Sequence, residues 1–420
     1  MGSFFPFLVV ILAGRGFDPA QIGVATAAAS VAYTSTVPAW GHLGDVTLGR
    51  ARALQLGTIG AAVAVGLFAL PLPMLVAAGL VVVFNAFQSS MQPLSDALAL
   101  AHVPDRGRDY GRVRLLASLA FAITSVACGV LYDRVGFWAT APVFAAAAAW
   151  ICVSVIALRE TPPGRTRHAV AADAAPGAAG ARARPAAGPV AADAFTPPPP
   201  RSRLGTAGEA LALQPRLPGV LLAIGLIQVG VLASFTYLPL RITDLGGGPE
   251  LVALAAGVSA LAEVPGILLA GTVAARIGLR GLFAVGSVAY AACIASWIVI
   301  DAPAAIVATR AVTGVAFGGI LVASALTIGS LLPPRLQATG QALYQTVAFG
   351  LAAIVANLGG GLIYGSVGPA LMFGLTAAAA LGAAVVGAIV FPVRGAAVGP
   401  LDESAVAVAL APDHEVPLGM

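Results

Sequence analysis

Long apolar stretches, separated by short polar connections, follow one another along almost the whole chain. There are twelve, six on each side of a polar insert rich in Arg, Ala and Pro. They cover residues 2–14, 21–41, 53–72, 75–100, 111–132, 137–158, 218–240, 250–274, 281–300, 304–331, 341–364 and 369–392. A helix needs about 20 apolar residues to cross the hydrocarbon core of a bilayer, and a helix satisfies its own backbone groups there. The pattern predicts an all-α integral membrane protein with 12 transmembrane helices in two six-helix bundles.

Composition supports this prediction. Hydrophobic residues make up 59% of the 420 residues and charged residues only 10%, so a water-soluble fold has too little polar surface to cover so many apolar side chains. The equal numbers of spans on the two sides of the insert indicate an internal repeat, which is typical of transport proteins.

The first stretch is shorter than the others. Only about a dozen residues precede Arg15, and as a helix they would rise about 18 Å, which is too little to cross a bilayer. A missing upstream segment is one explanation. A half-helix covered by its neighbours is the other.

The polar insert divides the chain into domains. It runs from RETPPGRTRH through Ala, Gly and Pro repeats to TPPPPRSR, and it lacks the aromatic and β-branched residues that a core requires. We therefore expect an N-terminal bundle over 1–158, a disordered cytoplasmic linker over 159–217, a C-terminal bundle over 218–392 and a disordered cytoplasmic tail over 393–420.

The distribution of arginine predicts the orientation. All 22 basic residues are arginine. If the N-terminus is cytoplasmic, 18 of them fall on the inner side, and the exceptions are Arg15, Arg134, Arg241 and Arg310. This bias follows the positive-inside rule. It predicts a multi-pass inner-membrane protein with both termini cytoplasmic, and it explains the net charge of +4 without a nucleic-acid partner.

Neither a metal nor a cofactor is expected. Cys128, Cys152 and Cys293 all lie inside apolar spans, without the spacing of a disulfide framework or a metal site. The chain has no Gly-Lys-Ser/Thr phosphate-binding loop and no cluster of a nucleophile with a base. The sequence therefore argues against transport driven by ATP and against an enzyme.

A short pattern recurs six spans apart, after the second and the eighth span. The first copy is GHLGDVTLGRAR at 41–52 and the second is GTVAARIGLR at 271–280. Each has a glycine on the helix, a glycine in the turn and basic residues that can meet helix C-terminal ends or a carboxylate. The residues of this motif are Gly41, Asp45, Gly49, Arg50, Gly271, Arg276, Gly278 and Arg280.

Both copies resemble the signature loop of the major facilitator superfamily, in which it gates the cytoplasmic side. The first copy departs from it by one inserted residue between Asp45 and Gly49 and by Val46 in place of a basic residue. The second has Ala275 where an acid often stands.

Two further stretches narrow the resemblance to one branch of the superfamily. PLSDALAL with YGRVRLLAS (93–118) and LLPPRLQATGQALYQTVAFG (331–350) look like the branch of phenylpropionic acid transporters, nucleoside–proton symporters and lactose permease. The resemblance covers nearly all of both bundles but neither the linker nor the tail. It implies a bacterial transporter that works by alternating access.

Glu263 lies in the middle of the eighth span. An ionised group near mid-bilayer costs about 2.5–3.5 kcal/mol on insertion scales, so its presence calls for a reason. One interpretation is a proton carrier that faces the central cavity. The other is a neutral or hydrogen-bonded glutamic acid that holds helices together.

Asp96 and Arg114 are expected at equal depth on the fourth and fifth spans, on the cytoplasmic side of the midplane, so they can form a pair. The resemblance to lactose permease implies substrate binding by both. Asp96 is also a candidate for proton coupling beside Glu263, because the tenth span lacks the coupling residues of lactose permease. A structural salt bridge at the inner mouth is the alternative.

The fourth span also carries a polar stripe that ends at Asp96. Asn85, Gln88 and Gln92 precede it at spacings of three and four, which predicts one helical face. Because these groups cannot face lipid, they are expected to line a cavity with substrate or to pack against other helices.

Arg310 in the tenth span is a further candidate for substrate binding. It can attract an anionic solute, pair with Glu263, or snorkel to the interface. This span departs from lactose permease, since Thr313 and Ala316 replace its proton-coupling residues. Gln345 in the eleventh span is a weaker substrate contact, because packing explains it equally well.

These observations predict a monomeric secondary transporter that imports a small organic solute by proton symport. An aromatic acid, a nucleoside or a sugar-like compound is expected. Proton-antiport efflux of a hydrophobic compound is one alternative, although the fifth span has only Gly129 in place of an antiport Gly/Pro motif. A non-transporting sensor with the same fold is the other, and the cost of its intramembrane charges argues against it.

Overall fold

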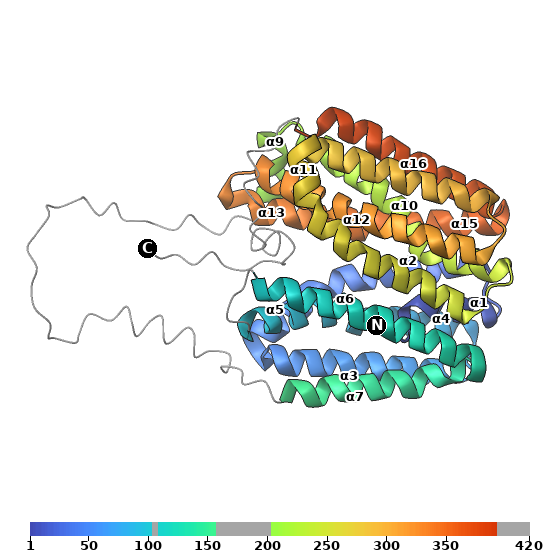
Figure 1. Ribbon diagram of the computed structural model, residues 1–420. Helices are drawn as coiled ribbons and strands as arrows, with labels where there is room; N and C mark the ends of the chain where they lie inside the picture. The colour runs from blue at the N-terminus through green and yellow to red at the C-terminus, as the bar shows by residue number, and fades with distance from the viewer. Residues whose placement is uncertain (103–107, 157–202, 393–420) are drawn as a thin grey trace, which may run out of the picture.

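The structure is all-helical. The computed structural model describes residues 1–102, 108–156 and 203–392, and every regular element within them is a helix (Figure 1). The elements of the first half are η1 (Phe5–Phe7), α1 (Leu8–Gly14), α2 (Pro19–His42), η2 (Leu43–Leu48), α3 (Arg50–Phe68), α4 (Met74–Gln88), α5 (Met91–His102), α6 (Arg108–Val135), η3 (Phe137–Ala139) and α7 (Thr140–Ile156). Those of the second half are α9 (Arg203–Leu213), α10 (Leu217–Asp244), α11 (Pro249–Val299), α12 (Pro303–Leu331), α13 (Pro334–Gln345), η4 (Thr346–Leu351), α14 (Ala352–Ile354), η5 (Val355–Gly359), α15 (Gly360–Ser366) and α16 (Pro369–Val390).

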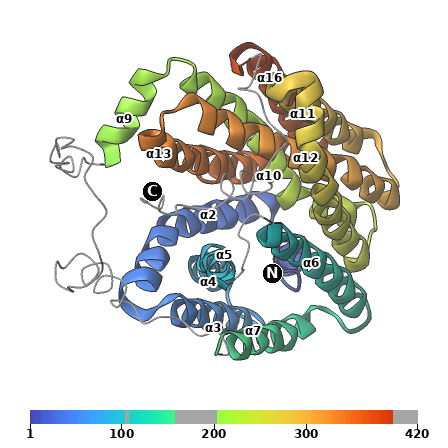
Figure 2. The ribbon, with the colours of Figure 1, turned by 60° about the vertical axis from the view of Figure 1, so that its left-hand side comes forward.

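The helices form two side-by-side groups that correspond to the two halves of the chain. Figure 2 shows α2 and α6 on the side of the first group that faces α10 and α11. We call the end at which α7 stops and α9 starts the linker end (left in Figure 1), and the opposite end the distal end. The predicted tail and residues 159–202 of the predicted linker lie outside the described residues.

Nine helical stretches within the described residues are long and apolar enough to cross a membrane. One of them, α11, is two helices that meet at Gly278, where φ is +74°. Helix α2 has 24 residues but does not qualify, because Ser, Thr and Tyr interrupt its apolar sequence. The apolar segment Phe5–Gly14 is shorter than a span. The all-α membrane fold is confirmed, and the number of twelve spans stays a prediction.

Helix α9 lies inside the segment that we expected to be a linker up to residue 217. Its Ala210 is fully buried, and Glu209 on the same helix forms an ion pair of 2.6 Å with Arg335 of α13. Contact with α13 therefore stabilises a helix that the local composition does not predict.

The predicted fourth span is interrupted at Ser89 and Ser90, between α4 and α5. Their hydroxyl groups donate to the carbonyls of Ala86 and Phe87, each at 2.8 Å. Such bonds compete with the helix backbone, and Pro93 follows without a backbone N–H. The helix is consequently irregular at this point, although Met74–Ala99 is still one stretch long and apolar enough to cross a membrane.

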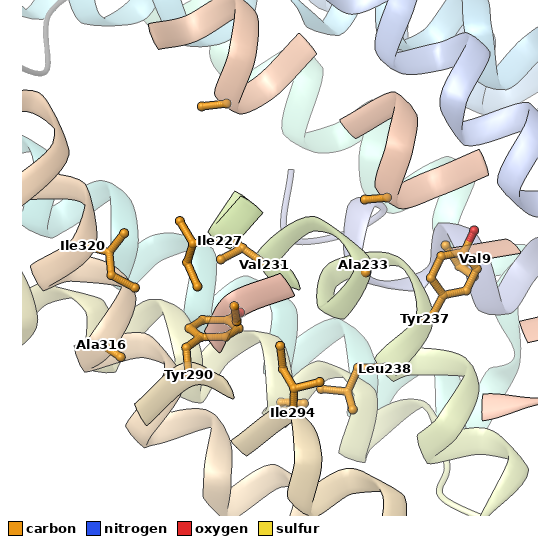
Figure 3. Packing of buried hydrophobic residues seen from close by; sticks show 14 of the residues in the cluster. Val9, Ile227, Val231, Ala233, Tyr237, Leu238, Tyr290, Ile294, Ala316 and Ile320 are labelled. Carbon is orange, nitrogen blue, oxygen red and sulfur yellow. The ribbon is translucent and has the colours of Figure 1, made fainter. Parts of the chain in front are cut away.

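The largest hydrophobic core joins the two halves and includes residues of α1, α10, α11 and α12. Figure 3 shows Ile227, Val231 and Leu238 of α10 beside Tyr290 and Ile294 of α11. The packing there leaves little space for a residue larger than glycine, since a Cβ on Gly230 would lie 3.2 Å from Ile294 Cδ1.

Backbone-to-backbone contact joins the halves at the distal end. Helix α2 packs against η5 and α15, and α6 packs against α11. A Cβ on Gly23 would lie 2.5 Å from the Asn357 carbonyl oxygen, and one on Gly361 would lie 2.5 Å from the Pro19 carbonyl oxygen. On the second contact, a Cβ on Gly129 would lie 2.3 Å from Ala253 Cβ. The distal end is therefore closed by close approach of the helices.

Candidate functional site

The linker-side part of the predicted polar stripe lies beside α2. Gln92 Nε2 donates to Asp96 Oδ2 at 2.8 Å. Asp96 is half-buried and close enough to the Tyr33 hydroxyl of α2 for an electrostatic interaction. Sequence reasoning missed Tyr33. Its phenol adds a donor that a solute hydroxyl or carboxylate can meet.

The distal part of the stripe is held inside the first half. Asn85 is buried and donates to the Val81 carbonyl at 2.9 Å, and Gln88 is buried and donates to Met1 Sδ at 3.0 Å. The break at Ser89 and Ser90 separates these two residues from Gln92 and Asp96. The prediction of one helical face for all four therefore stays a prediction, although the described contacts of the two pairs differ.

The predicted pairing of Asp96 with Arg114 has only one described side chain. Arg114 belongs to α6, but its side chain lies outside the described part of the chain. The pairing therefore stays a prediction.

Glu263 lies on the face of α11 that turns toward the other half. Ala256 lines a small cavity between the halves, and Glu263 follows it by seven residues, which places it on the same face about 10 Å nearer the linker end. Its half-buried side chain contrasts with the exposed Leu268 on the outward face. Gly314 and Gly318 of α12 pack against the backbone at Glu263, so small residues bring α12 close to this carboxylate.

Arg310 reaches the same boundary between the halves from α12. It is 2% exposed and lines the cavity of about 30 Å³ that also contacts Phe5 and Phe121 of the first half. Its NH1 group donates to Thr313 Oγ1 at 3.0 Å, and its guanidinium lies 5.5 Å from the centre of the Phe235 ring. An Arg310 side chain buried to this extent does not snorkel to the interface between lipid and water. The Arg310 cation is therefore enclosed by an aromatic ring and a hydroxyl group at the boundary between the halves.

Asn357 connects the two halves through its bond to Ser30 and is held within its own half by two further hydrogen bonds. Its Nδ2 donates to Ser30 Oγ of α2 at 3.1 Å, and its Oδ1 accepts from Thr236 Oγ1 of α10 at 2.7 Å. Its carbonyl oxygen accepts a bond from the Tyr237 hydroxyl. Asn357 lies in the π-helical segment η5, a local geometry that occurs often at functional sites.

The contact between Asn357 and Ser30 was not predicted from the sequence. A usable signal was present, since Thr26, Ser30 and Thr34 recur every four residues along α2 and so share a face. Gln345, by contrast, ends α13 with an exposed side chain. Nothing in its surroundings distinguishes a substrate contact from a surface position.

The first copy of the repeated motif forms a turn at the linker end. Gly49 has φ of +85°, and Arg50 Nε donates to Asp45 Oδ1 at 2.8 Å. The segment Leu43–Leu48 is π-helical. A π turn closes with a bond to the fifth residue rather than the fourth, so it accommodates the extra residue that separates this copy from the family pattern.

The second copy forms an equivalent turn within α11. Gly278 has φ of +74°, the counterpart of Gly49. Arg280 donates to the carbonyl of Phe391 from Nε at 2.8 Å and to that of Ile389 from NH2 at 3.2 Å, so it satisfies carbonyls at the end of α16. Arg276 is exposed. Gly41 and Gly271 lie on the helices that precede the two turns, as the repeat requires.

Comparison with known proteins agrees with the architecture. The family model described as the MFS_1 like family matches residues 1–375. Maltose permease of Geobacillus stearothermophilus is 29% identical over 366 residues, which cover 86% of this chain and 84% of the permease. The probable 3-phenylpropionic acid transporter of Escherichia coli (strain K12) is 37% identical over 134 residues, 31% of this chain and 34% of that protein.

Solved structures share the fold at low sequence identity. A mutant of the nucleoside transporter NupG has a TM-score of 0.75 at 14% identity, with 93% of this chain and 96% of that chain covered. A D-xylose–proton symporter has a TM-score of 0.64 at 13% identity, with 91% of each chain covered. The predicted kinship with the major facilitator superfamily is confirmed. The chain belongs to the MFS_1 like family and is a membrane transporter of the major facilitator type, not an enzyme.

Proposed function

We propose that this transporter imports a small organic solute together with protons by alternating access. The observation that carries the proposal is the position of Glu263, an ionisable group on the face of an apolar helix that turns toward the other half. A carboxyl group in such a place can load and release a proton as the halves rock. Inserting an ionisable group into the membrane costs free energy, which argues against a glutamate at this position without a function.

The solute is proposed to bind between the halves. Arg310 contributes a positive charge at the distal side of Glu263, and Asp96, Gln92 and Tyr33 contribute hydrogen-bonding groups toward the linker end. This combination suits an aromatic acid, a nucleoside or a sugar-like compound. The solutes in the names of the maltose permease, the nucleoside transporter and the D-xylose–proton symporter fall in the same range. Arg114 is proposed to complete the site beside Asp96.

Orientation and location are part of the same proposal. The arginine bias places the linker end at the cytoplasm, with both termini on that side of a bacterial inner membrane. In that orientation the structure has its outer end closed by α2 against α15 and α6 against α11. The protein is proposed to act as a monomer.

Uptake into proteoliposomes tests the proposal. Labelled aromatic acids, nucleosides, monosaccharides and disaccharides would be offered with and without an inside-alkaline pH gradient. We expect one class to accumulate only with the gradient. Glu263→Gln should abolish accumulation while leaving solute exchange across the membrane measurable. Glu209→Gln, which changes a glutamate in α9 away from the boundary, serves as the matched control.

Each other outcome contradicts part of the proposal. Equilibration that ignores the gradient would exclude proton coupling and the role of Glu263. Gradient-driven extrusion from vesicles of the opposite polarity, without uptake, would establish efflux instead. Full accumulation by Glu263→Gln would move the coupling group elsewhere.

A further inference from the structure

One cavity lies outside the boundary between the halves. It has a volume of about 260 Å³ and opens at the distal end of the first half, between α1, the end of α3 and the start of α7. Its lining runs from apolar side chains to polar ones. The apolar part is formed by Phe4, Ile11, Val65, Phe68, Phe137 and Ala141. Arg15, Trp138 and Thr140 supply the polar part.

Arg15 gives this cavity a positive charge. Its guanidinium donates to the Leu70 carbonyl at 3.2 Å and to the Phe68 carbonyl, and it lies 4.3 Å from the centre of the Phe68 ring. Two of its five N–H groups are thus engaged, which leaves donors for a further acceptor. Within the described residues, no carboxylate forms an ion pair with it. Partial burial lowers the pKa of Arg15, as expected for a cation without a counter-charge, but an arginine stays protonated.

The other arginines predicted for the distal side differ from Arg15. Arg241 lies 3.6 Å from Asp301, and Arg310 is buried among helices of the second half. Arg134 is exposed at the end of α6 and does not line the cavity. Arg15 therefore combines a charge that is not neutralised by an acid with a cavity that can receive an anion.

Trp138 places the mouth of the cavity at the depth of lipid headgroups. It is 68% exposed on the turn between α6 and α7, and tryptophan prefers the interface between lipid tails and water. Thr140 is 4% exposed and, although it lies near the Tyr132 hydroxyl, its Oγ1 has no partner in hydrogen-bond geometry within the described residues. An apolar floor below a cation and a hydroxyl at headgroup depth matches an amphipathic anion.

We propose that this cavity binds the headgroup of an anionic phospholipid, with the phosphate on Arg15 and an acyl chain against the apolar floor. A phospholipid fits better than a soluble anion, because the floor is apolar and the mouth lies where headgroups concentrate. The site is separate from the proposed solute path, since none of its lining residues is among those proposed to bind solute or proton. The proposal thus stands whether or not the transported solute is the one expected.

Quenching of Trp138 by brominated lipids tests the site directly. The purified protein would be reconstituted in nanodiscs of phosphatidylcholine with equal small fractions of brominated phosphatidylglycerol or brominated phosphatidylcholine. The difference in quenching between the wild-type protein and Trp138→Phe reports on this cavity, because the contribution of the other tryptophans cancels. We expect phosphatidylglycerol to bind about fivefold more tightly, the ratio that one arginine contributes next to an anionic lipid.

Substitutions then assign the preference to the cavity. Arg15→Gln should reduce the preference to about onefold, Arg15→Lys should keep most of it, and Arg134→Gln should leave it unchanged. Thr140→Val, which keeps the charge, should weaken it by a smaller factor. Thermal unfolding of each variant shows that the fold is retained.

Three results would overturn the proposal. Equal quenching of the wild-type protein by both lipids would show ordinary annular contact, and this result does not depend on any variant folding. A preference that survives Arg15→Gln would place the site elsewhere. Displacement of the lipid by millimolar glycerol phosphate would show that the cavity takes soluble anions rather than a phospholipid.

Discussion

Gly23 offers the sharpest test of how the distal end closes. It lies on α2 where the two halves meet, and a Cβ there would lie 2.5 Å from the Asn357 carbonyl oxygen and 3.0 Å from Gly361 Cα. These neighbours are backbone atoms, which cannot rotate away as a flexible side chain can. Gly23→Ala should therefore force α2 and α15 apart and shift the transporter toward a state that is open at the distal end.

The size of the shift follows from the packing. Inserting one methyl group into a tight contact costs about 1–3 kcal/mol, which corresponds to roughly 5- to 150-fold in the ratio of two states. Alanine also favours the helix over glycine by about 1 kcal/mol, but this gain is not specific to the contact. Gly66→Ala in α3 is the matched control, because a Cβ there meets nothing within 4 Å.

Distances between spin labels across the contact measure the outcome. Val24 on α2 and Val367 after α15 are exposed at the distal end, so labels there should not disturb the packing. We expect a longer-distance population to grow in Gly23→Ala and to stay at the wild-type level in Gly66→Ala. An unchanged distribution in folded Gly23→Ala protein would refute the reasoning, as would an equal shift in both variants.

Three further variants test other contacts. Asn357→Ala removes two side-chain bonds, of which the one to Ser30 joins the halves; loss of that bond, at about 0.5–1.5 kcal/mol, should also enlarge the longer-distance population, and an unchanged distribution would contradict its role. Gly278→Ala places a side chain at φ of +74°, which costs about 1–2 kcal/mol, so its thermal unfolding temperature should fall while that of Gly374→Ala does not. Arg280→Gln loses bonds to carbonyls at the end of α16 and should lower stability by roughly 1–3 kcal/mol; equal unfolding temperatures would show these bonds to be without effect.

The repeated motif shows what the sequence could predict. Gly49 and Gly278 are six spans apart, yet both have positive φ at the turn that the shared pattern predicts. Such a turn is a local property, because only glycine adopts this conformation without strain. The spans were predictable for a similar reason, since a lipid environment requires a long apolar helix whatever its neighbours are.

The polar stripe shows where local reasoning ends. Spacing places Asn85 and Asp96 on one face, but it predicts neither the irregular turn at Ser89 and Ser90 nor the bond of Asn85 to the Val81 carbonyl. The bond between Asn357 and Ser30 could not be predicted from local sequence either, because Ser30 is 327 residues away along the chain. A polar residue in a membrane helix indicates that it has a partner, but only the packing of the helices determines which residue that partner is.

The polar groups between the halves separate along the axis of the molecule, and this separation bears on mechanism. At the distal end, the Asn357 side chain bonds to Ser30 and Thr236, and the flanking glycines bring the helices into close contact. Toward the linker end, Glu263 and Asp96 lie half-buried. A carrier that alternates must break one set of contacts without losing the other. Groups that close the distal end are therefore distinct from those proposed to hold solute and proton, and substitutions in each set should change different properties of transport.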